Sequence, residues 1–140
     1  MLEVSVHIEA TPDTVFQYFT NPTKYVQWMG AHARLILAPG GEYRVRMRDG
    51  VETSGEFVEI DPPKRVVFTW GWENDAAVPP GSTRVEVTLE PDGTGTRVVL
   101  RHHDLPGAAH IEHHRQGWEL YLNRLALRAT GTDPGPDPNA

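Results

Sequence analysis

The sequence of 140 residues contains no cysteine. Thiolate catalysis, disulfide bridges and cysteine-ligated zinc or iron–sulfur centres are therefore excluded. Positive charge is also scarce, because 13 Lys and Arg stand against 19 Asp and Glu and leave a formal net charge of −6. A protein that follows nucleic-acid phosphates needs the opposite balance, so we expect no nucleic-acid partner.

Long apolar runs are missing as well. The amino terminus, Met1-Leu2-Glu3-Val4, lacks the basic region and the apolar stretch of a signal peptide, and no run is long enough to span a membrane. We therefore expect a cytoplasmic protein without membrane insertion.

The chain nevertheless has the apolar residues that a core needs. Residues of this kind make up 39% of it, including four Trp, four Tyr and four Phe. This composition predicts one domain of ordinary size, which we place at residues 1–129. The segment 130–140 has three prolines and no apolar pattern, so we expect a disordered tail there.

The first thirty residues predict a strand and two short helices. Leu2 to Glu9 alternates apolar and polar residues, which is typical of a half-buried strand. Thr11-Pro12 is a capping residue followed by proline, and it predicts a helix from about 12 to 20. Asn21-Pro22 repeats the signal and predicts a second short helix that ends before Gly30.

From Arg34 to Leu105 the period is two, which predicts about six antiparallel strands separated by turns. In the hairpin around Asp49-Gly50, a two-residue turn would mix charges into the apolar face. A three-residue loop instead pairs Val45 with Thr53 and Arg46 with Glu52, and we predict that register. Arginines 44, 46, 48 and 101 share the polar side with acidic residues, so a solvated charge lattice is favoured over a basic patch.

Residues 108 to 129 have a helical period. Its apolar stripe is formed by Ile111, His114, Trp118, Tyr121, Leu122 and Leu125. A long amphipathic helix that follows an antiparallel sheet buries its stripe by lying across that sheet, so the pattern predicts an α+β fold of two layers. The sheet must curl around the helix.

Several segments together resemble a known family. They are Thr11 to Phe16, Trp28-Met29-Gly30, Gly40 to Val45, Gly55 to Trp70, Thr96 to His102 and Gly117-Trp118, together with the alternating first strand. In this order they are similar to the activator of heat-shock-protein 90 ATPase homologues, which belong to the START-like SRPBCC superfamily. The resemblance covers residues 2–129. It implies a helix-grip fold, with a curved antiparallel sheet of six to seven strands wrapped around a long carboxy-terminal helix, and a cavity between the two.

The side chains that face inward in this arrangement are the candidate ligand-binding residues. They could line an apolar pocket or simply pack against each other as core. The set is Trp28, Tyr43, Val45, Met47, Phe57, Phe68, Trp70, Val87, Leu100, His102, Trp118, Tyr121 and Leu122. Gly117 lies in mid-helix, where a glycine needs a reason such as close packing or room for a ligand.

His102 ends an inward apolar strand face and is the candidate catalytic residue. A neutral imidazole there could bind a ligand or transfer a proton, with Tyr43 or Tyr121 as a hydrogen-bond donor. The alternative is a core histidine satisfied by its neighbours. His110, His113 and His114 have a spacing that could hold a metal, but a solvated helix face is favoured, and we predict neither metal nor cofactor.

Three functions are compatible with these features. The leading hypothesis is a module that binds a small hydrophobic molecule, such as a lipid or a polyketide, without chemistry. The second is an enzyme of the cyclase or hydratase type that uses the same cavity. The third, suggested by the resemblance, is a module that interacts with a chaperone partner.

Overall fold

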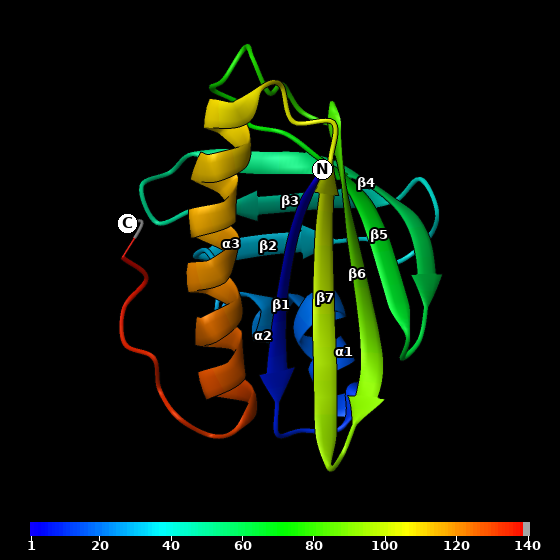
Figure 1. The fold of residues 1–140 in the computed structure, drawn as a ribbon. Coiled ribbons are helices and arrows are strands. Elements are labelled where there is room, and N and C mark those ends of the chain that lie inside the picture. Colours follow the sequence, from blue (N-terminus) through cyan, green and yellow to red (C-terminus); the bar gives the residue numbers. More distant parts are fainter. Residues whose placement is uncertain (139–140) are drawn as a thin grey trace.

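The computed structural model describes residues 1–138, which form one antiparallel sheet and three helices (Figure 1). In chain order, the elements are β1 (Leu2–Ile8), α1 (Pro12–Thr20), α2 (Pro22–Tyr25), β2 (His32–Leu35), β3 (Glu42–Arg46), β4 (Glu52–Asp61), β5 (Arg65–Trp70), β6 (Thr83–Asp92), β7 (Gly95–His103) and α3 (Ala108–Ala129).

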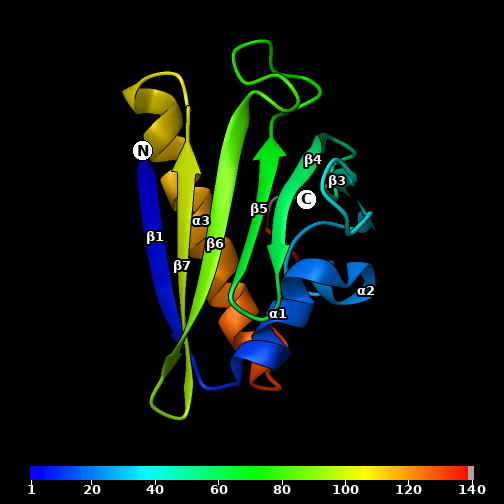
Figure 2. The same ribbon diagram turned by 90° about the vertical axis from the view of Figure 1, so that its right-hand side faces the viewer.

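The seven strands follow the order β1-β7-β6-β5-β4-β3-β2, and every neighbouring pair is antiparallel. The sheet is strongly curled, so that β2 and β3 at one edge run at a steep angle to β1 and β7 at the other (Figure 1). The helix α3 lies in front of the concave face (Figures 1 and 2). This arrangement confirms the expected helix-grip fold. None of the helices within residues 1–138 is long and apolar enough to cross a membrane.

Both short helices begin at their expected caps. The hydroxyl oxygen of Thr11 accepts a hydrogen bond from the backbone N–H of Thr14. The side-chain oxygen of Asn21 accepts from the N–H groups of Thr23 and Lys24, at 2.9 and 3.2 Å. These contacts satisfy backbone donors that a helix start leaves without partners.

The β3–β4 hairpin has the predicted register. Val45 is opposite Thr53, and Arg46 is opposite Glu52. The N–H of Met47 donates to the carbonyl of Val51, and Gly50 has a φ of +91°, which glycine adopts without strain. The apolar residues of both strands therefore stay on the same face of the sheet across the turn, and Met47 is buried on the inner face.

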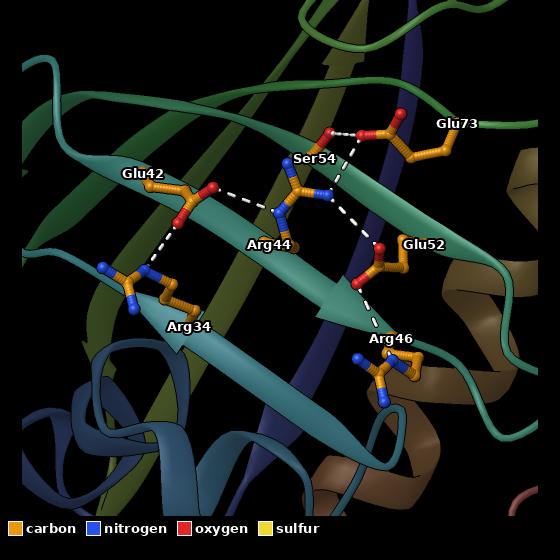
Figure 3. Close-up of polar contacts among 7 residues, drawn as sticks. All are labelled: Arg34, Glu42, Arg44, Arg46, Glu52, Ser54 and Glu73. Carbon is orange, nitrogen blue, oxygen red and sulfur yellow. Dashed lines mark hydrogen bonds and ion pairs between the residues drawn. The ribbon is translucent and has the colours of Figure 1, made fainter.

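On the outer face of β3 and β4, charges are paired with each other (Figure 3). The guanidinium of Arg44 donates to carboxylates of Glu42, Glu52 and Glu73 over 3.1 to 3.3 Å. Ser54 donates to the same oxygen of Glu73. The outer face is therefore the expected charge lattice and not a basic patch.

The described part of the segment 130–140 has polar contacts with α3. Arg124 of α3 is buried and donates to the backbone carbonyls of residues 134–136, and it also donates to the carbonyl of Trp28. Asp137 is also buried, and it accepts hydrogen bonds from the hydroxyl of Tyr121 and the N–H of Gly30. Polar contacts of this kind leave no apolar pattern in a sequence. Residues 139 and 140 of the expected tail lie outside the described residues.

Candidate ligand-binding cleft

An open cleft of about 770 Å³ lies between the amino-terminal half of α3 and one end of the sheet. Its other walls are the β3–β4 turn and the loop that joins β5 to β6, and both are visible beside the upper half of α3 in Figure 1. The lining residues are Met29, Met47, Asp49, Val51, Trp70, Trp72, Asn74, Asp75, Ala109, His110, His113, His114, Gln116, Gly117, Trp118, Leu120 and Tyr121.

Aromatic rings form the deepest part of the cleft. The ring centroids of Trp70 and Trp118 are 5.0 Å apart, so sheet and helix are in contact here. Trp72 meets the edge of Trp70 at 5.5 Å. The open space is consequently a cleft beside the contact between helix and sheet, and it opens to the surface.

Four of the thirteen candidate residues line this cleft, namely Met47, Trp70, Trp118 and Tyr121. The other nine do not line it and are at most 1% exposed. Those nine are Trp28, Tyr43, Val45, Phe57, Phe68, Val87, Leu100, His102 and Leu122. They pack on each other: the ring of Tyr43 is stacked on that of Phe68 with centroids 4.1 Å apart. For these nine, burial in the core is the role that the geometry gives.

The core also holds one polar pair. The hydroxyls of Tyr25 and Tyr43 are hydrogen-bonded over 2.5 Å, and neither ring is exposed. Burial raises the pKa of Tyr25 and of Tyr43 above the ordinary value, so both phenols stay protonated at neutral pH. Neither phenol lines the cleft.

His102 is held from both sides by neighbouring side chains. The indole N–H of Trp118 donates to its Nδ1 over 3.0 Å, so Nδ1 carries no proton. The proton of the neutral ring is then on Nε2, which donates to Oγ1 of Thr83 over 2.8 Å. The hydroxyl of Thr83 in turn donates to the carbonyl of Trp70. Burial, followed by the charges of His114 and His103, lowers the pKa of His102 to about 3. Neither nitrogen is left for a substrate.

His114 has a similar environment but the opposite tautomer. The indole N–H of Trp72 donates to its Nε2 over 3.1 Å, while Nδ1 donates to the carbonyl of His110. Burial lowers the pKa of His114, although the hydrogen bond to His110 acts in the other direction. Because one nitrogen donates and the other accepts within the protein, His114 is not a free metal ligand. The described residues contain no group of three side chains that could hold a metal ion.

Sequence patterns point to two further lining residues, Trp72 and Gly117. Trp72 continues the alternation of Trp70, so parity alone indicates that it faces inward. Gly117 borders the cleft, and a Cβ added there meets no neighbouring atom within 4 Å. Asp49, Asn74 and Asp75 lie in loops, where no periodicity indicates which side chain faces the helix.

Several solved structures have this fold. The AHSA1-like protein of Rhizobium etli is 39% identical, with a TM-score of 0.76, over 99% of this chain and 87% of that chain. An HSP90 activator from Plasmodium falciparum is 21% identical with a TM-score of 0.75, over 92% and 95% of the two chains. DynU16, a protein in the dynemicin biosynthetic locus, is 25% identical with a TM-score of 0.81. The match covers 94% of this chain and 48% of DynU16.

Among curated proteins, none matches the sequence. The family model described as "Activator of Hsp90 ATPase homolog 1-like protein" matches residues 9–129, which include all elements from α1 to α3. With the helix-grip fold and the similarity to the Rhizobium etli protein, this match confirms the resemblance seen in the sequence. The chain belongs to the Activator of Hsp90 ATPase homolog 1-like family.

Proposed function

We propose that this protein binds a small hydrophobic molecule in the cleft between α3 and the sheet. The observation that carries the proposal is a cleft of about 770 Å³ whose floor is made of the rings of Trp70, Trp72 and Trp118. A volume of this size lies within the range of small-molecule sites, which are mostly apolar with a few polar groups. Burial of apolar ligand surface supplies the binding free energy.

The shape of α3 supports the same proposal. Gly117 stands where the helix borders the cleft, and an alanine there would favour the helix by about 1 kcal/mol. Close packing does not explain the glycine, because a Cβ added at this position would meet no neighbouring atom within 4 Å. The glycine leaves room in the cleft without serving the packing of the core.

Binding without chemistry is favoured over the cyclase or hydratase alternative. That alternative relied on His102 as the acid or base and on Tyr43 or Tyr121 as donor. Both nitrogens of His102 are hydrogen-bonded in the interior, and the hydroxyl of Tyr43 is bonded to that of Tyr25. The hydroxyl of Tyr121 donates to Asp137. These contacts stabilise the fold, and they leave none of the three side chains available for proton transfer to a ligand.

A chaperone partner is the second candidate. It is favoured by the family and by the likeness to an HSP90 activator. Ile36 and Leu37 are exposed apolar side chains in the segment between β2 and β3, away from the cleft, and a partner could cover them. The test measures chaperone binding by a variant with serine at both positions and by a variant with a filled cleft. Unchanged binding by both variants would show that neither the exposed apolar pair nor the cleft contacts the chaperone.

The ligand-binding proposal is tested with N-phenyl-1-naphthylamine, an uncharged dye that fluoresces in apolar surroundings. We expect saturable binding to the wild-type protein. The variant Gly117→Leu fills the cleft from the helix side, and we expect it to weaken binding by more than tenfold without lowering the thermal midpoint.

Asn123→Leu is the matched control for this experiment. Asn123 is exposed on the same helix and does not line the cleft, so the same side chain there leaves dye binding unchanged. Equal binding by wild type and Gly117→Leu would contradict the proposal. Native mass spectrometry of freshly purified protein adds an independent reading, because a retained small molecule should be lost in Gly117→Leu and kept in Asn123→Leu.

A further inference from the structure

Within residues 1–138, the permanently charged side chains that line the cleft are both negative. Asp49 of the β3–β4 turn and Asp75 of the loop between β5 and β6 line it, and no lysine or arginine does. The remaining polar residues of the lining are Asn74 and Gln116 and the three histidines of α3. A ligand that enters the cleft therefore meets two carboxylates and no permanently charged cation.

Three arginines that are close in the sequence to these walls are paired with carboxylates or lie outside the lining. Arg44 is bound by three carboxylates on the outer face of the sheet (Figure 3). Arg115 of α3 is paired with Glu112 and donates to the carbonyl of Glu3. Arg48 precedes Asp49 directly and is exposed, but it is not among the lining residues. Arg44 and Arg115 are thus engaged by carboxylates, and Arg48 is outside the lining.

Both carboxylates are fixed by backbone hydrogen bonds. One oxygen of Asp49 accepts from the N–H of Val51, and one oxygen of Asp75 accepts from the N–H of Ala77, each over 2.9 Å. Asp75 is also half-buried, and its charge acts on His114 at the cleft wall, where it partly offsets the effect of burial on the pKa of that histidine. Both carboxylates are therefore held at the cleft. Reduced exposure to water strengthens the field of Asp75, whereas Asp49 is exposed to solvent.

The floor favours a flat guest. Trp70, Trp72, Trp118 and Tyr121 contribute rings to the lining, and aromatic pairs gain from offset stacking and edge contacts in addition to the burial of area. Building on the proposed function, we propose that the cleft selects uncharged aromatic compounds and rejects carboxylates, sulfonates and phosphates. Fatty acids and phospholipids with an anionic head group are thereby disfavoured as ligands.

Two dyes with a common skeleton test this inference. N-phenyl-1-naphthylamine is uncharged, and 8-anilinonaphthalene-1-sulfonate has the same rings with one sulfonate. Both titrations are made at about pH 8.5, where an ordinary imidazole is neutral. We expect the uncharged dye to bind at least tenfold more tightly than the sulfonate at low ionic strength, with a smaller ratio at high salt.

The decisive variant is the double substitution Asp49→Asn and Asp75→Asn. Asparagine keeps the oxygen that accepts the backbone hydrogen bond, so the loops keep their anchors. We expect the affinity for the sulfonate dye to rise by about tenfold and the affinity for the uncharged dye to change by less than twofold. The control is Glu56→Gln with Glu90→Gln, which removes two exposed carboxylates outside the cleft.

The results for the two dyes distinguish charge selection by the cleft from ligand binding by the cleft, on which charge selection rests. A selective gain for the sulfonate in the cleft variant, absent from the control, supports charge selection. No gain, or an equal gain in the control, overturns charge selection while binding of the uncharged dye still supports the proposed function. If the uncharged dye does not bind to the wild-type protein, both proposals fail.

Discussion

The indole N–H of Trp118 donates to Nδ1 of His102 across 3.0 Å and joins α3 to β7 by a buried hydrogen bond. The bond requires the neutral form of the imidazole, because a protonated ring has no acceptor. Helix and sheet are therefore held together by a contact that acid can break.

Stability should fall as the pH drops below about 6.5. The pKa of His102 is lowered to about 3 in the folded state, so between these values the unfolded chain takes up a proton that the folded protein refuses. The stabilisation is fully present above pH 6.5, and the free energy of unfolding decreases by about 1.4 kcal/mol per pH unit below it for this one group. Burial lowers the pKa of His114 in the same direction.

Urea denaturation at pH 7.5, 6.5 and 5.5 measures this slope. His7 is exposed and acts in the opposite direction, since its hydrogen bonds to Glu9 and Asp92 raise its pKa. The comparison is therefore made in a His7→Gln background. The further change His102→Gln should make the slope shallower, and an unchanged slope would remove His102 as its source.

Two tryptophans of similar burial should differ in their response to loss of the indole N–H. Trp118 and Trp70 are 3% and 1% exposed, but the N–H of Trp118 is bonded to His102, whereas that of Trp70 has no partner among the described residues. Trp118→Phe leaves Nδ1 of His102 without its donor, so we expect it to destabilise by about 1–2 kcal/mol more than Trp70→Phe. Chemical denaturation of the two variants checks the difference, and equal losses would contradict it.

The pair of Tyr25 and Tyr43 should behave as a coupled unit. Either single change to Phe leaves one buried hydroxyl without its partner, at a cost of about 1–3 kcal/mol. The double change removes both hydroxyls, so its cost should be smaller than the sum of the single changes. A double-mutant cycle measures the coupling, and simple additivity would indicate that the hydrogen bond contributes little.

The segment after α3 should contribute to stability although its sequence is polar. Asp137→Ala removes the acceptor used by the hydroxyl of Tyr121 and the N–H of Gly30, and we expect a loss of about 1–3 kcal/mol. Thr132→Ala in the same segment is exposed and serves as the control. A similar thermal midpoint for wild type and Asp137→Ala would show that the contact has little weight.

The fold could be predicted from the sequence wherever a periodic pattern meets a recognisable cap or turn. The alternation through Met47 and Val51 was enough to select the loop length and the register of the β3–β4 hairpin. The stripe around Trp118 located the long helix over the residues that form α3. Burial of apolar side chains imposes these patterns directly, so they can be read in a single chain.

The cleft could be predicted only in part. Parity shows that Leu100 and Met47 both face inward, but it does not show that one is covered by neighbours while the other borders open space. That distinction depends on how the sheet curls and on where α3 lies. Asp49 and Asp75 were missed because loop conformation, which no period reveals, brings them to the cleft. The contacts of residues 134–137 with α3 leave no pattern either, because carbonyl acceptors are common to all residues.

The floor and the rim of the cleft belong to different kinds of structure. The floor residues Trp70 and Trp118 are buried in regular elements and hold the two layers together, whereas Asp49 and Asp75 stand on connecting loops. Loops accept changes of length and sequence far more readily than packed layers do. If the cleft binds ligands as proposed, substitutions in these loops would change the polarity of the entrance while the aromatic base and the scaffold stay unaltered.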